Sequence, residues 1–266
     1  MNYTVPGYLT PFMLTGMITI ITAVLLGLRR ALRSAAWPEQ DRAKAFWTVS
    51  SLLVGWFVFA VVTSMAGWYR PQSGPPTIQY GLLIPIVVGV VLFRTWPLLR
   101  RTLALVPDSW LVGVQLYRVL GVIFLVLYAG GHLSALFALP AGLGDSLVGI
   151  IAPFVAASIT GSSEELVRRV RFWNLLGITD LVIAVTIGFL TSPSPLQMAS
   201  FDRPSTLIAM FPLSLIPVFA VPLSILLHIA SLQRLSQHQV TGRGQQRIQI
   251  GSTSELQRKT ANSIQQ

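Results

Sequence analysis

The sequence predicts an all-α integral membrane protein, a bundle of about seven transmembrane helices, and three observations lead to that fold class. The 266-residue chain is 53% hydrophobic and only 11% charged, whereas soluble domains carry about 25% charged residues. Its apolar residues gather in runs longer than the roughly 18 residues that a spanning helix requires. Basic residues alternate between rich and poor connections, as an odd number of spans requires.

Seven segments of the chain are long and apolar enough to cross a bilayer. Backbone groups inside hydrocarbon must bond within their own segment, so each segment is predicted to be a helix. The ten-residue alternation of a membrane barrel is absent from the sequence. The predicted spans are Leu9–Leu28, Ala45–Ala66, Ile78–Trp96, Leu111–His132, Leu139–Ile159, Phe172–Thr191 and Leu207–Leu232.

Lysine and arginine residues predict the orientation of the bundle. From the N-terminal to the C-terminal tail, the segments between the spans hold 0, 5, 1, 3, 0, 3, 1 and 5 of them when Arg94, near the end of the third span, is counted with the connection that follows it, and Arg118 remains inside a span. The total is 16 on one side against 2 on the other, so the positive-inside rule predicts an N-terminus outside and a C-terminus in the cytoplasm. We therefore expect a multi-pass protein of the cell membrane, which in a bacterium is the inner membrane.

Composition divides the chain into two parts. Residues 1–235 are predicted to form the seven-helix transmembrane domain. Residues 236–266 are predicted to be a disordered, basic and polar cytoplasmic tail, because they are rich in Gln, Ser, Thr and Gly. The net charge of +10 comes from short loops and this tail and not from one face of a folded domain, so no nucleic-acid partner is expected.

The sequence predicts no cofactor and no metal site. The chain contains no cysteine, which excludes disulfides, thiolate nucleophiles and cysteine-ligated metals. His132 and His228 are expected at opposite ends of their spans, about a membrane thickness apart, so one haem iron cannot bind both. The topology resembles that of microbial rhodopsins, but Lys44 and Lys259 lie outside the spans and cannot form a retinal Schiff base.

Three charged residues, Arg118, Asp145 and Asp180, lie inside the predicted spans. A charge near the bilayer centre costs from about 2.5 kcal/mol upward, so such residues usually face the bundle interior and pair. Counting along the helices places Arg118 and Asp180 at the same depth, about 12 Å from the cytoplasmic surface, which predicts an ion pair. Asp145 falls about 9 Å from their level. An unpaired carboxylate there would favour its neutral form, which makes Asp145 a candidate for reversible protonation.

Residues near these charges suggest a pathway. Gln115 lies three residues before Arg118 and shares its helix face. Pro140, Gly142 and Gly144 precede Asp145 and predict an interrupted helix, like those that bind ions or substrates in transporters. A plain helix N-terminus with an acidic first turn is the alternative, and a third possibility is that Asp145 caps a broken helix end after Pro140.

A short motif gives a different interpretation of the two aspartates. Gly142, Leu143, Gly144 and Asp145 resemble the GxGD element of intramembrane aspartyl proteases. The resemblance covers four residues and implies that Asp180 is the second catalytic aspartate, sharing a proton with the first. Those families carry GxGD on the later of the two catalytic helices, whereas here it lies on the earlier one.

Three functions are compatible with this pattern. The first is a small transporter or proton- or ion-coupled permease, in which Asp145 binds a proton or cation and Arg118 with Asp180 forms a switchable pair. The second is a non-catalytic membrane subunit or scaffold, whose charges fix the packing of helices and whose partner is another membrane protein or a second copy. The third is an intramembrane aspartyl hydrolase that uses Asp145 and Asp180. The sequence favours the first, which is not an enzyme.

Overall fold

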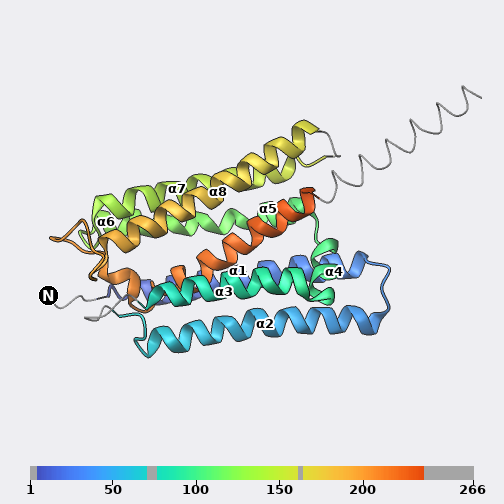
Figure 1. Cartoon of the computed structure of the whole chain (residues 1–266), viewed down its shortest axis with the longest axis horizontal. Coiled ribbons are helices and arrows are strands. Elements are labelled where there is room, and N and C mark those ends of the chain that lie inside the picture. Colours follow the sequence, from blue (N-terminus) through green and yellow to red (C-terminus); the bar gives the residue numbers. More distant parts are fainter. Residues whose placement is uncertain (1–4, 71–76, 161–163, 237–266) are drawn as a thin grey trace, which may run out of the picture.

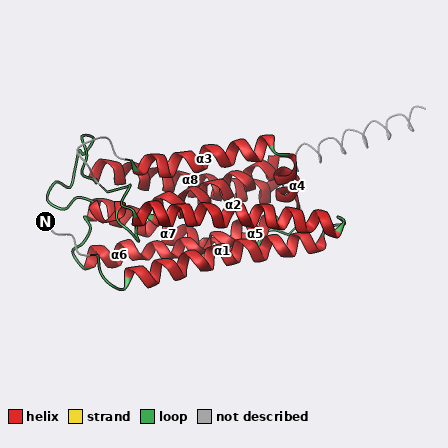
Figure 2. Cartoon of the chain, turned by 90° about the horizontal axis from the view of Figure 1, so that it is seen from below, coloured by secondary structure: helices red, strands yellow, loops and turns green. Residues whose placement is uncertain are grey.

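The computed structural model describes residues 5–70, 77–160 and 164–236, and within these ranges the chain forms helices and loops without a strand. Seven helices in the described ranges are long and apolar enough to cross a membrane, as predicted. They run side by side in one bundle (Figure 1 and Figure 2). The seven are α1 (Leu9–Ser34), α2 (Glu39–Met65), α3 (Ile78–Thr95), a fourth span (Asp108–Ala129), α7 (Ala135–Ala157), α8 (Glu164–Thr191) and a seventh span (Ile216–Ser236).

The two ends of the bundle differ in charge. At the end where α1 and α7 begin and α8 ends, on the left in Figure 1, the described connections hold Arg70 and Arg203 as their basic residues. We call this the arginine-poor end. The opposite, arginine-rich end holds the α1–α2 and α7–α8 connections and the short helix α4. Seven apolar helices indicate a membrane-embedded protein, and the predicted tail after Ser236 lies outside the described residues.

Helices α1, α2 and α8 extend beyond their predicted spans at the arginine-rich end. Helix α1 continues to Ser34, α2 begins at Glu39 and α8 begins at Glu164. The added turns contain Arg, Lys, Glu and Gln, which are good helix formers. Hydropathy therefore locates the apolar part of each helix and leaves these polar ends undetected.

The fourth span changes its winding in the middle. It consists of α5 (Asp108–Gly113), a 3₁₀ stretch (Val114–Gly121) and α6 (Val122–Ala129). In a 3₁₀ helix, residues three apart lie above one another. The buried residues of the stretch follow that spacing, so they form one inward face; they are Gln115, Arg118 and Gly121.

The seventh span begins later than the sequence predicted. Residues 206–209 form a 3₁₀ turn, Met210 is extended, and the continuous helix begins at Ile216 with a π-helical turn that ends at Ala220. The predicted start at Leu207 is therefore wrong. Proline supplies no amide hydrogen, so Pro212 does not fit the interior of a regular helix. Pro217 lies in the first turn of the helix, where a proline is tolerated.

Helix α4 (Pro97–Leu105) was not predicted. It lies across the arginine-rich end, with Leu99 and Thr102 buried and two arginines exposed. Arg234, near the end of the seventh span, donates from Nη1 to the carbonyl of Leu103 at 2.9 Å and from Nε to Asp108 at 2.8 Å. These bonds tie the last turn of α4 to the seventh span.

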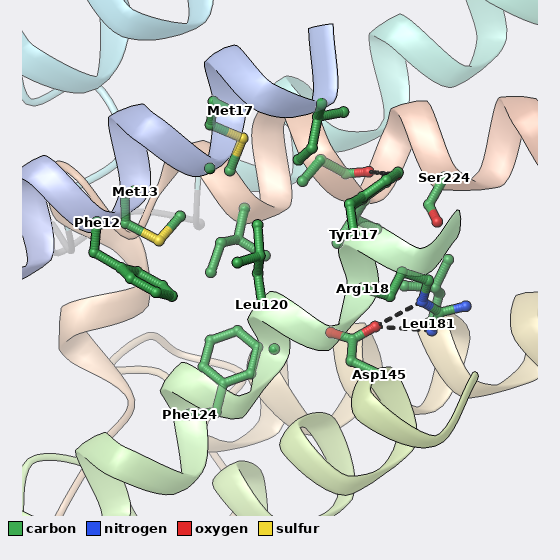
Figure 3. A pocket seen from close by; sticks show the side chains of 16 residues that line it. Phe12, Met13, Met17, Tyr117, Arg118, Leu120, Phe124, Asp145, Leu181 and Ser224 are labelled. Atoms are coloured by element: carbon green, nitrogen blue, oxygen red, sulfur yellow. Dashed lines mark hydrogen bonds and ion pairs between the residues drawn. The ribbon is translucent and has the colours of Figure 1, made fainter. Parts of the chain in front are cut away.

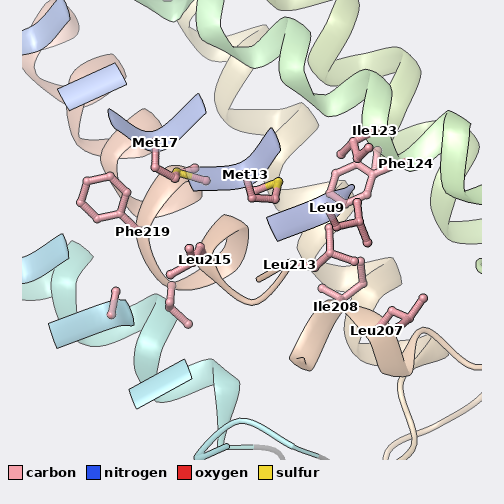
Figure 4. Packing of buried hydrophobic residues seen from close by; sticks show 14 of the residues in the cluster. Leu9, Met13, Met17, Ile123, Phe124, Leu207, Ile208, Leu213, Leu215 and Phe219 are labelled. Carbon is pink, nitrogen blue, oxygen red and sulfur yellow. The ribbon is translucent and has the colours of Figure 1, made fainter. Parts of the chain in front are cut away.

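The largest cluster of buried apolar side chains lies toward the arginine-poor end and joins α1, the fourth span and the seventh span (Figure 4). The outward faces of the bundle are also apolar: Val58, Phe59 and Val62 on α2 are more than half exposed. Large exposed apolar surfaces suit contact with lipid. Among the buried residues of the cluster are Leu9, Met13, Met17, Phe124, Leu207, Leu213, Leu215 and Phe219.

Candidate functional site: a buried arginine between two carboxylates

Arg118 is 3% exposed and makes contacts with three other spans. Its Nε donates to Oδ1 of Asp145 at 2.8 Å, and its Nη2 lies 2.8 Å from the same oxygen and also pairs with Asp180. Its Nη1 donates to the carbonyl of Gly177 at 3.2 Å and faces Nε2 of His228 at 3.4 Å. Every nitrogen of the guanidinium therefore faces an acceptor.

The predicted Arg118–Asp180 ion pair is present, but the expected separation of Asp145 from these residues is wrong. Helix α7 begins at Ala135, four residues before the predicted start, so Asp145 lies deeper than was calculated. All three charges lie ten or eleven residues from the arginine-poor ends of their helices. Because an α-helix rises about 1.5 Å per residue, they reach nearly the same level and meet.

The predicted helix interruption before Asp145 is also wrong. Helix α7 runs without a break from Ala135 to Ala157, and Pro140, Gly142 and Gly144 lie within it. Pro140 is the sixth residue of the helix, so its missing amide hydrogen removes a single backbone bond near the start. Asp145 therefore lies in the helix interior and caps no helix end.

The glycines of α7 allow close approach of its neighbours. A Cβ atom added to Gly144 would lie 1.7 Å from Oδ1 of Asp180, and one added to Gly149 would lie 2.6 Å from the backbone nitrogen of Val119. Small residues on membrane helices generally serve such contacts. Here they bring the fourth span and α8 near enough to α7 for the two carboxylates to share one guanidinium.

Gln115 fastens the fourth span to the seventh. It is fully buried, its Nε2 donates to the carbonyl of Ser224 at 3.0 Å, and its Oε1 accepts from the Ser224 hydroxyl at 2.6 Å. The Tyr117 hydroxyl donates to the carbonyl of Ala220 at 3.1 Å. Gln115 lies one 3₁₀ turn from Arg118, so the structure brings these two predicted residues onto one face.

The expected position of His228 at the end of its span is wrong, because its side chain is fully buried beside Arg118. Its Nδ1 lies 2.9 Å from Oδ1 of Asn174, whose amide nitrogen donates to the carbonyl of Val170 and to the hydroxyl of Ser231. Since the amide oxygen of Asn174 is an acceptor, Nδ1 of His228 carries the hydrogen. Its Nε2 faces an Arg118 donor and accepts, so this histidine is neutral.

Sequence reasoning missed Ser224, Ser231 and Asn174 and misplaced His228. Ser224, His228 and Ser231 are separated by four and three residues, which places them on one helix face. That polar stripe in an apolar segment was the available signal. With His228 neutral, the cluster of Arg118, Asp145 and Asp180 carries a net charge of −1 when both carboxylates are ionised.

Two cavities meet at Asp145. The first cavity, about 40 Å³, lies between α1, the fourth span and the seventh span and is also lined by Arg118 (Figure 3). The second cavity, about 80 Å³, extends to the arginine-poor end, where Ser192, Pro193 and Ala209 line it. The residues shared by both linings are Phe124, Asp145, Leu181, Ile216 and Val221.

Residues 75–236 match a family described as a domain of unknown function (DUF8737), and the match covers more than half of the chain. The chain belongs to this family. The DUF8737 region contains α3 and every later span, and therefore Arg118 and all its partners, whereas α1 and α2 precede it. No curated protein and no solved structure matches the chain.

Proposed function

We propose that the protein is a small proton- or cation-coupled permease of the cell membrane, in which Asp145 binds and releases the transported or coupling cation. The proposed orientation places the arginine-poor end outside and the arginine-rich end in the cytoplasm. One observation carries the proposal: Asp145 lies at the inner end of a cavity that extends from the arginine-poor end, in a cluster whose formal net charge is −1 when both carboxylates are ionised. An excess charge within hydrocarbon is costly, which favours uptake of a proton or cation there.

Competition for Arg118 supplies a coupling mechanism. A cation bound at Asp145 weakens the attraction between Asp145 and Arg118, while the Arg118–Asp180 pair remains. The 3₁₀ stretch that carries Arg118 and the π-helical turn Ile216–Ala220 lie beside the cavities. Such irregular windings often mark functional hinges. We propose that the fourth and seventh spans rearrange at these segments when the occupancy of Asp145 changes.

The arrangement does not favour the hydrolase interpretation of the GxGD resemblance. An aspartyl dyad works because two adjacent carboxylates share a proton and activate a water. Here the guanidinium of Arg118 lies between Asp145 and Asp180 and pairs with both. A guanidinium that pairs with both carboxylates competes for the oxygens that would share the proton of a dyad.

A non-catalytic scaffold is the second candidate, and the completeness of the polar network favours it. Arg118, Gln115, His228 and Asn174 are all buried and all hydrogen-bonded. Fully satisfied buried networks fix one packing arrangement. In this case the bundle would assemble with another membrane protein or a second copy, and Asp145 would serve the register of the helices alone.

Asp145→Asn separates the two candidates. In proteoliposomes we expect voltage-driven proton or cation uptake to fall to the level of protein-free liposomes, because the neutral amide binds no cation. Asp202→Asn, which removes an exposed carboxylate at the arginine-poor end, is the matched control and should leave uptake unchanged. Unchanged uptake in a monodisperse, folded Asp145→Asn protein would contradict the permease and favour the scaffold.

A further inference from the structure

We infer that the two cavities together bind a small apolar monocation, such as an alkylammonium ion, with its ammonium group on Asp145 and its apolar part in the second cavity. This inference names the substrate class of the proposed permease and rests on that function. It follows from the hydrogen-bonding groups, the charge, the volume and the apolar lining of the cavities.

One carboxylate oxygen of Asp145 is a free hydrogen-bond acceptor that faces the cavities. Its Oδ1 is held by Arg118, but no described residue donates a hydrogen bond to its Oδ2. Asp145 is 8% exposed, and Figure 3 shows this second oxygen turned away from Arg118, on the side of Leu120 and Phe124. A buried carboxylate oxygen without a donor favours a ligand that supplies one.

The other polar groups of the first cavity are acceptors as well. The Tyr117 hydroxyl donates its hydrogen to a backbone carbonyl, and the Ser224 hydroxyl donates its hydrogen to Gln115. Toward a ligand, both hydroxyl oxygens can therefore act only as hydrogen-bond acceptors. All nitrogens of Arg118 already face acceptors. The cavity therefore offers acceptors without a free donor, which suits an ammonium group and disfavours a carboxylate or phosphate ligand.

The net charge of the cluster favours a ligand with a single positive charge. With both carboxylates ionised, the formal charges of Arg118, Asp145 and Asp180 sum to −1. A monocation therefore brings the cluster to neutrality, whereas a divalent cation would leave a net charge of +1. A bare metal ion also needs several oxygen ligands, six to eight for calcium. Around Asp145 the first cavity adds the hydroxyl oxygens of Tyr117 and Ser224, which are too few for such coordination.

The volume and lining indicate a short apolar body. Cavities of about 40 and 80 Å³ together approach the roughly 150 Å³ that admits benzene in an engineered apolar cavity. Apolar side chains, including Leu181 and Phe189, line most of the second cavity. Phe124 and Phe137 lie in edge contact with ring centroids 5.2 Å apart near Asp145, and aromatic faces attract ammonium groups.

Direct binding tests this inference. Butylammonium chloride, sodium butyrate and 1-butanol, which match in size and differ in charge, are titrated into the purified full chain in a nonionic detergent by calorimetry. We expect saturable binding of butylammonium, at least about tenfold tighter than that of 1-butanol because an ion pair in a low-dielectric site is strong. Butyrate should give no saturable heat.

Substitutions in the cavities test whether butylammonium binds there. Asp145→Asn should abolish butylammonium binding, and the control Asp202→Asn should retain it. Ala184→Phe, which fills the second cavity and leaves the carboxylates in place, should also abolish it. Ala209→Leu at the mouth of the cavity serves as a second filling variant if Ala184→Phe does not fold.

Equal binding of butyrate, or undiminished butylammonium binding by folded Asp145→Asn, would overturn the inference. The proposed permease function and the proposed substrate class can be contradicted by different results. Saturable, Asp145-dependent butylammonium binding without any flux in proteoliposomes would support the cation site and contradict transport. Asp145-dependent proton uptake without butylammonium binding would overturn the substrate class and leave the permease standing.

Discussion

Arg118→Met is expected to lower the free energy of unfolding by about 3–5 kcal/mol, because it leaves the buried Asp145 and the half-buried Asp180 without their cation. The methionine fills much of the space of the arginine stem, so loss of the charge and its hydrogen bonds dominates. Arg203→Met, which removes an exposed arginine at the arginine-poor end, is the matched control and should change stability by no more than about 0.5 kcal/mol. Unfolding of the purified proteins in detergent, followed by circular dichroism, measures both.

Neutralising the carboxylates should reverse much of this loss. The variant Arg118→Met, Asp145→Asn, Asp180→Asn has no buried charge in the cluster, and removing all partners of a buried ionic network is far less costly than removing one. It should regain stability and still lack cation uptake, because Asp145 is absent. A single Arg118→Met protein as stable as the control would show that the three-residue network does not hold the spans together.

Gly149→Ala is expected to lower the free energy of unfolding by about 1–3 kcal/mol, the usual cost of overpacking a core. The new methyl group would lie 2.6 Å from the backbone nitrogen of Val119 and 3.1 Å from the carbonyl carbon of Arg118. Backbone atoms cannot rotate away, so α7 must move from the fourth span and weaken the contact between Asp145 and Arg118.

Gly55→Ala in α2 is the matched control. A Cβ atom there has no neighbour within 4 Å, and alanine is up to about 1 kcal/mol more favourable than glycine in a helix. The two variants should therefore move the thermal midpoint in opposite directions, with reduced cation uptake in Gly149→Ala alone. Stabilisation of both proteins would contradict the close approach of α7 and the fourth span.

The parts of this molecule that were predictable depend on local patterns. Long apolar runs were enough to find the seven spans, and charged residues within them were enough to single out Arg118, Asp145 and Asp180. Hydropathy failed at the helix ends. The residues just before Leu139 are themselves apolar, so the start of α7 at Ala135 was invisible and Asp145 was placed too near the surface.

The rest of the site depends on packing between spans. The 3₁₀ winding that aligns Gln115 and Arg118 has no clear sequence signature, and the cavities result from how Phe124, Leu181 and their neighbours fill space. The polar stripe of the seventh span, by contrast, was visible in the spacing of Ser224 and His228. It was overlooked because His228 was assigned by its distance from the end of the span alone.

Helix α1 adds a wall that the DUF8737 region does not contain. Phe12, Met13 and Met17 of α1 line the first cavity opposite Arg118 (Figure 3). The first helix therefore forms one wall of the cavity beside the charged cluster, although the cluster itself is built entirely from later spans. The second cavity provides the proposed access to Asp145 from the arginine-poor end.

That access is tested most directly by cysteine labelling, since the chain contains no native cysteine and one introduced thiol gives no background. Ala141→Cys places the thiol in the second cavity with Asp145, and Ala152→Cys buries one in the same helix away from both cavities. Cationic 2-aminoethyl methanethiosulfonate is applied from the arginine-poor side. It should label Ala141→Cys faster than the anionic 2-sulfonatoethyl reagent does. Ala152→Cys should remain unmodified. An unlabelled Ala141→Cys protein, or equal labelling at both positions, would contradict a path from that side to Asp145.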